Sequence, residues 1–482
     1  MRQAVVLIHG IGEQRPMSTA RGFVEAVLQA AEQGRSQIFS KPDRMAETFE
    51  LRRLVAEKSS SRPMTDFYEY YWAYHMQGTK LRHLWPWLRT ILLRPPSRVP
   101  SKLRVIWVLS WMLALGAGFF FLKSRFSPDS VLGRGSSWTS LALAGLFLFI
   151  QGFAISSVGD AARYLSPLPS NIAIRQKIRS EGIDLLRRLH GSGRYDRVIL
   201  VGHSLGSVIG YDILTHLWSQ YNEEHAEPER SPQPALSEVE RLGKQLDASP
   251  SPKDLEEFRK AQRRLWIEQR SLAFPWLITD FVTLGSPLAH AAILLARDAG
   301  ELRTRQEQRE LPRCPPATDK NRIWYRHDYR HHGVPRTIRV LDHAALFAPT
   351  RWSNIYFPVR FGLLGDLVGG PMRPIFGSGI LDIPVTDGLV RFAPLLPHTH
   401  YWRGAVVPKR QGRTCALGAL CDVLALDSRD WLPRPGRPPG PSRTGTRGKR
   451  SIVASGSTID FGPSTRRGPA SRPAQAGPPS SA

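Results

Sequence analysis

The chain has little cysteine and lacks the short motifs of nucleic-acid-binding domains. Its 482 residues include three cysteines, Cys314, Cys415 and Cys421. This odd number, without the spacing of a metal site, predicts neither a disulfide framework nor a zinc domain. No zinc-finger spacing and no aromatic RNP motif occurs, so the formal net charge of +25 does not by itself indicate nucleic-acid binding.

The sequence also leaves no room for a cleavable signal peptide. It runs from Met1, Arg2 and Gln3 directly into the apolar residues 4–8, whereas a signal peptide needs a basic segment and a longer apolar one. Together with the scarcity of cysteine, this favours a reducing, cytoplasmic location for the main domain.

Positive charge is concentrated in two places. Residues 403–482 hold fourteen Lys and Arg against four Asp and Glu. The second group lies in segment 79–104, directly before an apolar run, and its members are Lys80, Arg82, Arg89, Arg94, Arg98, Lys102 and Arg104. A basic group beside an apolar run suits anionic lipid head groups better than a DNA groove. We therefore expect membrane lipids, and no nucleic acid, as partners.

Charged residues are absent from two long apolar runs, 105–122 and 137–158. Each approaches the ~20 residues that cross ~30 Å of hydrocarbon, so we interpret 105–158 as a transmembrane helical hairpin. The alternative is a pair of helices buried in a large soluble domain. Because the flanks carry more Lys and Arg than the connecting loop, both flanks are predicted on the cytoplasmic side. The protein would then be an integral membrane protein whose main domain faces the cytoplasm.

The rest of the chain alternates between strand and helix patterns. Residues 4–8 predict a buried strand, 19–33 a helix and 65–75 a strand. After the second apolar run the same patterns predict a helix at 172–189 and strands at 197–201, 276–284 and 352–357. Such alternation is typical of an α/β fold, a mostly parallel sheet with helices on both faces.

The domain organisation follows from these patterns. Segments 1–78 and 159–402 are expected to form one α/β domain, with a charged helical insertion over its core at 221–271. Residues 403–482 are basic and rich in Pro, Gly and Ser, so we expect a disordered tail there, with only a brief apolar patch at 416–426.

The strongest chemical signal is the pentapeptide 202–206, Gly-His-Ser-Leu-Gly. A buried strand precedes it and a helical pattern follows it, which is the context of a nucleophile elbow. The tight turn requires small residues at Gly202 and Gly206 and presents Ser204 as a nucleophile. The alternative is a plain strand-to-helix turn with a spectator serine.

A nucleophilic serine also needs donors for the oxyanion of its tetrahedral intermediate. One backbone amide would come from Leu205. The second would come from the loop after the first strand, where residues 9–12, His-Gly-Ile-Gly, are similar to the His-Gly oxyanion loop of lipases and esterases. Ile11 is the first choice and Gly12 the second; the alternative is a glycine turn that ends a strand.

With these motifs the chain resembles the α/β-hydrolase superfamily, especially its lipase-like and esterase-like members. Residues 281–288, which contain Gly-Ser-Pro, are similar to the strand and turn that follow the elbow in lipases. The resemblance covers about residues 1–75 and 160–402. It implies an α/β-hydrolase-type fold and acyl transfer to water by a Ser-His-acid triad, without metal or organic cofactor.

By this resemblance the acid and then the base follow the serine in the chain. Asp366 lies in the loop beyond the strand at 354–357, where the superfamily keeps its acid. The stretch between that strand and Asp366 is longer than usual, which leaves three alternatives open: Asp342, Asp382 and Asp387.

The base is expected in the sequence Pro-His-Thr-His-Tyr-Trp at 397–402. Related hydrolases tend to place Tyr-Trp three and four residues after the base, which selects His398 and leaves His400 as the alternative. A third group of histidines precedes the expected acid, and we interpret it as a solvated polar loop: His327, His331 and His332. His203 is assigned to packing or to a pocket wall.

The predicted function is hydrolysis of carboxylic esters, with a lipid or another acyl ester that partitions into membranes as substrate. This substrate class depends on the predicted membrane location alone. Two alternatives remain: an amide or thioester hydrolase with the same triad, or a membrane-tethered scaffold that kept the fold and lost catalysis.

Overall fold

The computed structural model describes most of the first 428 residues. The described residues are 2–10, 15–32, 37–46, 50–60, 62–76, 95–96, 104–126, 145, 164–165, 169–224, 226–228, 232–246, 249–331, 334–360, 364–388, 390, 396–404 and 415–428.

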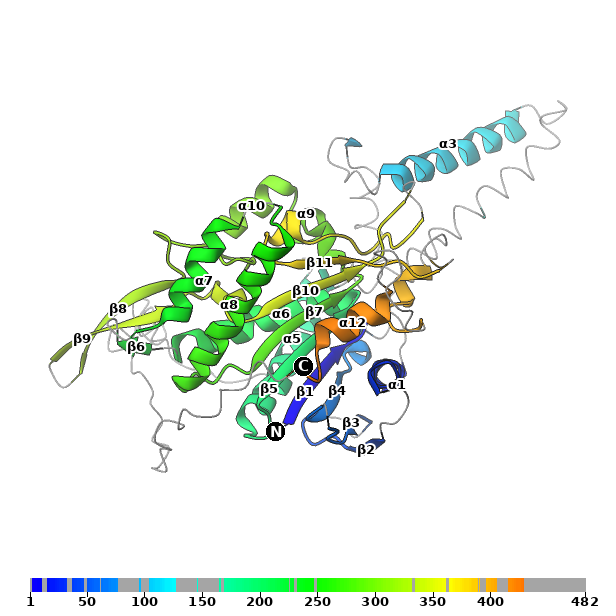
Figure 1. The fold of residues 1–482 in the computed structure, drawn as a ribbon. Helices are drawn as coiled ribbons and strands as arrows, with labels where there is room; N and C mark the ends of the chain where they lie inside the picture. The colour runs from blue at the N-terminus through cyan, green and yellow to red at the C-terminus, as the bar shows by residue number, and fades with distance from the viewer. Residues whose placement is uncertain are drawn as a thin grey trace, which may run out of the picture. The chain divides into compact units, whose positions relative to one another are not determined.

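An eight-stranded sheet organises the described part of the chain (Figure 1). Its order is β11-β10-β7-β5-β1-β4-β3-β2. The strands from β11 to β4 run parallel to one another, whereas β3 runs antiparallel to β4 and β2 runs antiparallel to β3. The bounds are β1 (Arg2–Ile8), β2 (Ile38–Pro42), β3 (Arg52–Ala56), β4 (Met64–Tyr70), β5 (Arg197–His203), β7 (Ile278–Leu284), β10 (Arg351–Tyr356) and β11 (Leu381–Pro384). The predicted α/β class with a mostly parallel sheet is confirmed.

Ten α-helices are defined among the described residues. They are α1 (Ser18–Glu32), α3 (Arg104–Phe126), α5 (Pro169–Gly191), α6 (Leu205–Tyr221), α7 (Pro234–Gln245), α8 (Pro252–Ser271), α9 (Ala291–Leu294), α10 (Ala299–Glu307), α11 (Arg373–Phe376) and α12 (Ala416–Leu424). Short 3₁₀ helices lie at Ala73–Met76, Asn222–Glu224, Pro287–His290, Ala345–Phe347 and Leu396–Thr399.

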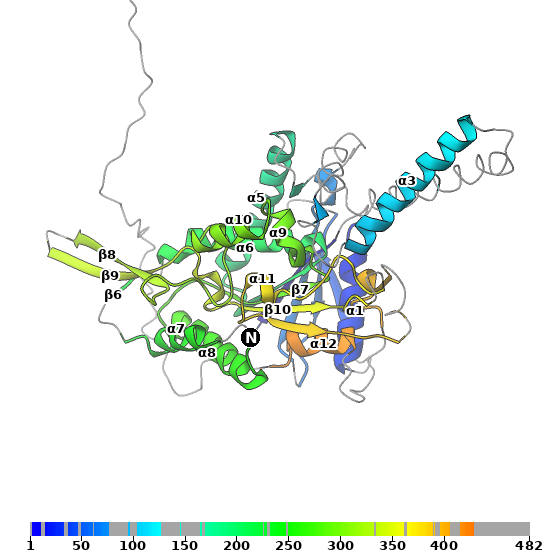
Figure 2. The same cartoon turned by 90° about the horizontal axis from the view of Figure 1, so that it is seen from above.

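Helices cover both faces of the sheet because its central strands are apolar on both sides. Along β1, Val5 and Leu7 belong to one core cluster and the alternate residues Val6 and Ile8 to the other, as the two-residue period of a strand requires. Helices α5 and α6 pack on the face of Val6, and α1 and α12 on the face of Val5 (Figure 2).

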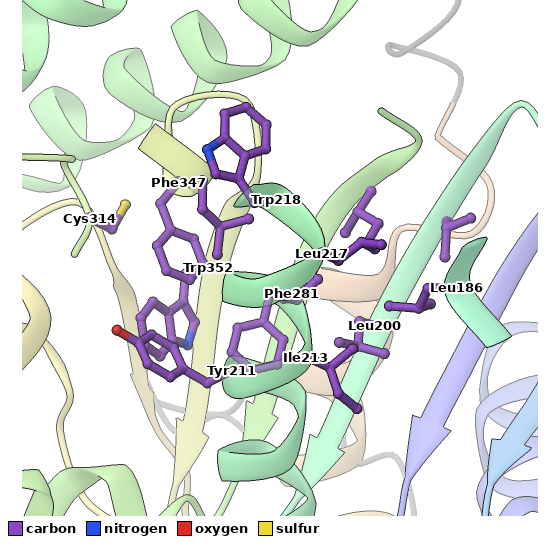
Figure 3. Packing of buried hydrophobic residues seen from close by; sticks show 14 of the residues in the cluster. Leu186, Leu200, Tyr211, Ile213, Leu217, Trp218, Phe281, Cys314, Phe347 and Trp352 are labelled. Atoms are coloured by element: carbon purple, nitrogen blue, oxygen red, sulfur yellow. The ribbon is translucent and has the colours of Figure 1, made fainter. Parts of the chain in front are cut away.

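Large aromatic side chains fill the core between α6 and the sheet (Figure 3). Trp352 stacks on Phe347 with ring centroids 4.6 Å apart. The polar edge of each indole is satisfied: Trp218 donates to the Asp342 carbonyl at 3.0 Å, and Trp352 donates to the Thr283 hydroxyl at 3.3 Å. Such burial of aromatic surface with paired N–H groups fixes α6, and with it the elbow at its start.

The charged segment 221–271, predicted as a helical insertion over the core, contains α7 and α8. Its amphipathic part is α8, whose side chains Phe258 and Leu265 are fully buried in the main core cluster. The apolar stripe of this helix therefore completes the core, although its mean composition is strongly polar.

The histidine-rich segment is not a loop, so that interpretation was wrong. It lies in β8 (Trp324–His331), which pairs with β9 (Val334–Leu341) in a second sheet that also holds β6 (Ala226–Pro228). His327 is exposed on this hairpin, and His332 lies outside the described residues. Residues 325–328 of β8 are exposed, which suits a strand that pairs along its backbone while its side chains meet water.

The predicted disordered tail begins too early. Residues 416–424 form α12, whose Leu420 and Leu424 are fully buried in the cluster that contains α1. Three apolar positions per two turns are enough to bury one helix face even where the flanking composition is basic and rich in Gly and Pro. The rest of the tail from residue 429 lies outside the described residues.

Of the two apolar runs, the first forms most of α3 and the second lies outside the described residues, apart from residue 145. Within the described part of the chain, no helix meets the length and hydropathy needed to cross a membrane. Large apolar side chains of α3 are nevertheless exposed: Val108, Met112, Leu115, Phe119, Phe121, Leu122 and Phe126.

Candidate active site

Ser204 lies at the turn between β5 and α6, at the carboxyl end of the parallel strands. Its backbone has φ 52° and ψ −128°, a conformation that side-chain-bearing residues rarely adopt. The Ser204 amide donates to the Leu284 carbonyl at 2.9 Å, which anchors the strained turn to the end of β7. Backbone strain held in place by a rigid framework is a feature of functional sites.

Gly202 and Gly206 occupy positions that admit no side chain. A Cβ atom on Gly202 would lie 2.5 Å from the Cα atom of Ser207, and one on Gly206 would lie 2.2 Å from the Ile8 carbonyl oxygen. The obstacles are backbone atoms, which cannot move aside cheaply. The turn is therefore as tight as the pentapeptide predicts.

Three predicted residues meet in one hydrogen-bonded chain. His398 Nε2 lies 2.8 Å from Ser204 Oγ, and His398 Nδ1 lies 3.0 Å from both carboxylate oxygens of Asp366. Because an ionised carboxylate can only accept, Nδ1 carries the proton. Nε2 is then free to accept a proton from the Ser204 hydroxyl, which is the arrangement that a general base needs.

Asp366 is completely buried yet well supplied with donors. Besides His398, the Val368 amide donates to Oδ1 at 2.9 Å and the Tyr401 hydroxyl to Oδ2 at 2.6 Å. Burial alone would raise the pKa of Asp366, but His398, the Tyr401 hydroxyl and the Gly369 amide together lower this pKa to about 2. Asp366 is thus a permanent anion beside the imidazole.

The alternative acids have other partners. Asp342 pairs with Arg309 and accepts from the Ala344 amide. Asp382 accepts from the Met372 and Arg373 amides at the start of α11. Asp387 accepts from the Ala416 amide at the start of α12.

His400, the alternative base, is directed elsewhere. Residues 396–399 form a 3₁₀ helix rather than an extended segment, so the side chains of His398 and His400 do not share a face. A Cβ atom placed on Gly404 would be 3.5 Å from His400 Nε2 and 3.2 Å from Asp387 Oδ2. These contacts place the His400 ring beside Asp387.

The oxyanion donors are described only in part. Leu205 is the first residue of α6, so its amide is among the first four N–H groups, which have no partner within a helix. Ile11 and Gly12 lie outside the described residues. The preceding His9 is fixed: its Nδ1 donates to the Gly10 carbonyl at 2.8 Å, and its ring stacks on Trp72, whose indole donates to the His9 carbonyl at 3.0 Å.

His203 makes a contact that no local sequence pattern indicates. Its Nε2 lies 2.8 Å from the backbone carbonyl of His398, and its ring packs edge-on against Trp402. Burial, followed by the nearby His398 ring, lowers the pKa of His203 to about 3. A neutral His203 that donates to this carbonyl holds the turn that carries the base.

A cavity of about 800 Å³ borders this group on the side of α1 and α12. His203, Thr399 and Trp402 form one wall, and Thr19 and Gly22 of α1 form another. Ser204 itself is 2% exposed. The assignment of His203 to a pocket wall thus agrees with the position of its side chain, but its contact with the base loop was missed.

Among the described residues, no group of three or more His, Cys, Asp or Glu side chains could hold a metal ion. Comparisons of the chain with protein-family models, with curated proteins and with solved structures found no match. The chemistry of the site therefore has to be inferred from its own geometry.

Proposed function

We propose that this chain is a serine hydrolase of the α/β-hydrolase type that cleaves carboxylic esters. One observation carries the proposal: the hydrogen-bonded chain from Ser204 through His398 to Asp366, at the carboxyl ends of parallel strands. The strained backbone of Ser204 and the tight packing of Gly202 and Gly206 give further support.

The proposed mechanism assigns one role to each residue. His398 Nε2 takes the hydroxyl proton as Ser204 Oγ attacks the acyl carbon, and the Leu205 amide donates to the oxyanion. Asp366 stabilises the imidazolium without taking its proton. The imidazolium then protonates the leaving alcohol, and a water molecule activated by His398 releases the acid from the acyl-enzyme.

Steady-state hydrolysis of p-nitrophenyl acyl esters by the full chain tests this proposal. Ser204→Ala should lower kcat by about 10⁴ to 10⁶, because members of a triad act as a unit. Ser219→Ala is a matched control, since Ser219 lies exposed on the same helix and donates only to the His216 carbonyl. Equal turnover by both variants would contradict the proposal.

The same assay separates the alternative functions. If the chain turns over matched amide or thioester substrates faster than esters, and Ser204→Ala loses this activity, the triad assignment stands and the substrate class is an amide or a thioester. A folded chain that hydrolyses none of the three would be an inactive scaffold.

We further propose that the chain is attached to a membrane and acts there on a lipid or another ester that partitions into bilayers. The exposed apolar side chains of α3 support this proposal, because a contiguous apolar surface in water marks an interaction site. Alkaline carbonate should leave the protein in the membrane pellet. Release into the supernatant would remove both the membrane location and the substrate class that depends on it.

A further inference from the structure

A second cavity, of about 330 Å³, is lined by residues of β2, β3 and β4. These strands lie at the antiparallel side of the main sheet (Figure 1). Its charged lining side chains are all basic: Lys41 of β2, Arg44 of the following turn, Arg53 of β3 and Arg194 of the turn before β5. The hydroxyl-bearing Tyr68 of β4 also lines it. Elements distant in sequence thus bring four cations around one hollow.

This cavity is remote from the candidate active site. Arg194 precedes the first residue of β5, whereas Ser204 follows its last. A seven-residue strand spans roughly 23 Å at about 3.3 Å per residue. The cavity therefore cannot form part of the surface that holds the reacting acyl group.

Among the described residues, the carboxylates that lie close to the four cations carry less charge than the cations do. Asp66 lies 2.7 Å from Arg2 and 3.2 Å from Arg53, so two guanidinium groups share it. A second carboxylate, Asp43, lies in the field of Arg53 and Arg188. These two anions already face three cations, and the charges of Lys41, Arg44 and Arg194 add to that excess.

The bottom of the cavity is polar and firmly held. Tyr68 is buried, and its hydroxyl lies 2.6 Å from that of Tyr195, which donates to Asp66 at 2.5 Å. Arg53 is fixed by Asp66 in the same network. Arg53 and the polar base are thus preorganised for an anion, because these groups lose little side-chain freedom on binding.

We propose that this cavity binds a phosphate group. A phosphomonoester carries a charge of about −1.5 to −2 at neutral pH and offers three acceptor oxygens, and guanidinium groups match those oxygens in pairs. A volume of about 330 Å³ lies at the small end of ligand sites, which suits a phosphate with a small organic group. The phosphate can belong to a soluble phosphomonoester or to a lipid head group.

The test removes two exposed cations of the cavity and compares them with two exposed cations elsewhere. The site variant is Arg44→Gln with Arg194→Gln; the matched control is Lys253→Gln with Arg303→Gln, which loses the same charge outside the cavity. Each full-length chain is titrated with inorganic phosphate, followed by calorimetry, and is sedimented with phosphatidic acid vesicles against phosphatidylcholine vesicles. Melting curves without ligand check that both variants fold.

Wild type and control should bind one of the two probes saturably, and the site variant should bind that probe about 100-fold more weakly, at about tenfold for each lost charged hydrogen bond. If the site variant binds only inorganic phosphate more weakly, the ligand is a soluble phosphomonoester. If it binds only the phosphatidic acid vesicles more weakly, the ligand is a lipid head group. Equal weakening in both variants, or no saturable binding of either probe to wild type, would overturn the proposal. Should the site variant not fold, Lys41→Gln alone gives the same comparison. Ester hydrolysis should be unchanged in every variant, so this result is independent of the proposed function.

Discussion

Two buried carboxylates, one at each end of the parallel strands, have similar pKa values for different reasons. Asp366, beyond the carboxyl end of β10, and Asp280, near the start of β7, both have a pKa of about 2 despite burial. At Asp366 the lowering comes from His398, Tyr401 and a backbone amide. At Asp280 it comes from the charges of three arginines: Arg351, Arg263 and Arg197.

The difference lies in whether the partner can change its charge. Arginine keeps its proton at every pH at which a protein folds, so Asp280 and Arg351, whose closest atoms are 2.6 Å apart, form a permanent structural pair. As the proposed general base, His398 takes up a proton and releases it again within each catalytic cycle. A buried anion next to such a group can stabilise a charge that appears only during a reaction, and this distinguishes a catalytic carboxylate from a structural one.

The largest expected effect comes from removing the partner of each carboxylate. His398→Ala should lower kcat by about 10⁴ or more, because a triad fails when one member is lost. Arg351→Ala should instead cost about 3 to 5 kcal/mol of stability, since it leaves a buried charge without its ion-pair partner. Turnover per folded molecule and chemical denaturation measure the two quantities.

His400→Ala is the control for the first of these variants. Because His400 lies beside Asp387 rather than Ser204, its loss should cost roughly tenfold at most, through local packing. A larger loss in His400→Ala than in His398→Ala would assign the base to His400.

Neutralising each carboxylate should give the next largest effect. Asp366→Asn should lower kcat by about 10³ to 10⁴, because the amide no longer fixes the Nδ1 tautomer of His398. Asp280→Asn should lower the melting temperature and leave kcat of the folded protein unchanged. Comparable kinetic losses in both variants would erase the distinction between the two ends of the sheet.

A smaller effect is expected at His203. Without the hydrogen bond from its Nε2 to the His398 carbonyl, the base loop loses its position, and kcat should fall about 10- to 100-fold in His203→Ala. KM should change little, since the contact holds the base rather than the substrate. His203→Gln keeps a hydrogen-bond donor and should recover part of the lost kcat. If kcat does not recover and KM rises by a similar factor, His203 serves as a pocket wall instead.

The smallest effect concerns acid unfolding. A folded-state pKa of about 2 lies below the ordinary aspartate pKa of 3.8 for both carboxylates. Each carboxylate therefore contributes stability that is present above pH 4 and is lost as the pH falls through about 2. The contribution is roughly 2 kcal/mol for each group. Urea denaturation between pH 5 and 2 measures this contribution. As the pH falls, the free energy of unfolding should decrease less in Asp280→Asn than in wild type. An equal decrease in both proteins would mean that Asp280 has an ordinary pKa.

The sequence predicted those features that depend on local pattern. Apolar runs predicted the central strands. The pentapeptide at 202–206 predicted the turn that holds Ser204, although the backbone atoms that require glycine come from nearby Ser207 at Gly202 and from distant Ile8 at Gly206. Asp366 and His398 were selected by similarity to known hydrolases, and the structure brings both to Ser204. The oxyanion residues Ile11 and Gly12 remain predictions.

Features that depend on long-range contacts were missed. The donation from Tyr401 to Asp366 joins residues 35 apart, and that from His203 to His398 joins residues 195 apart. Neither has a local signal. Helix α12 was assigned to a disordered tail because its short apolar patch is stabilised by burial against α1 and the sheet, and no sequence window contains these partners.

Mass spectrometry of the full chain after reaction with a fluorophosphonate tests the central claim most directly. Phosphonylation requires a serine activated by a neighbouring base, so the account predicts one adduct, on the peptide that contains Ser204. The adduct should be absent from Ser204→Ala and strongly reduced in His398→Ala. An unlabelled wild-type chain, or the same labelling in wild type and Ser204→Ala, would contradict the assignment of Ser204 as the nucleophile.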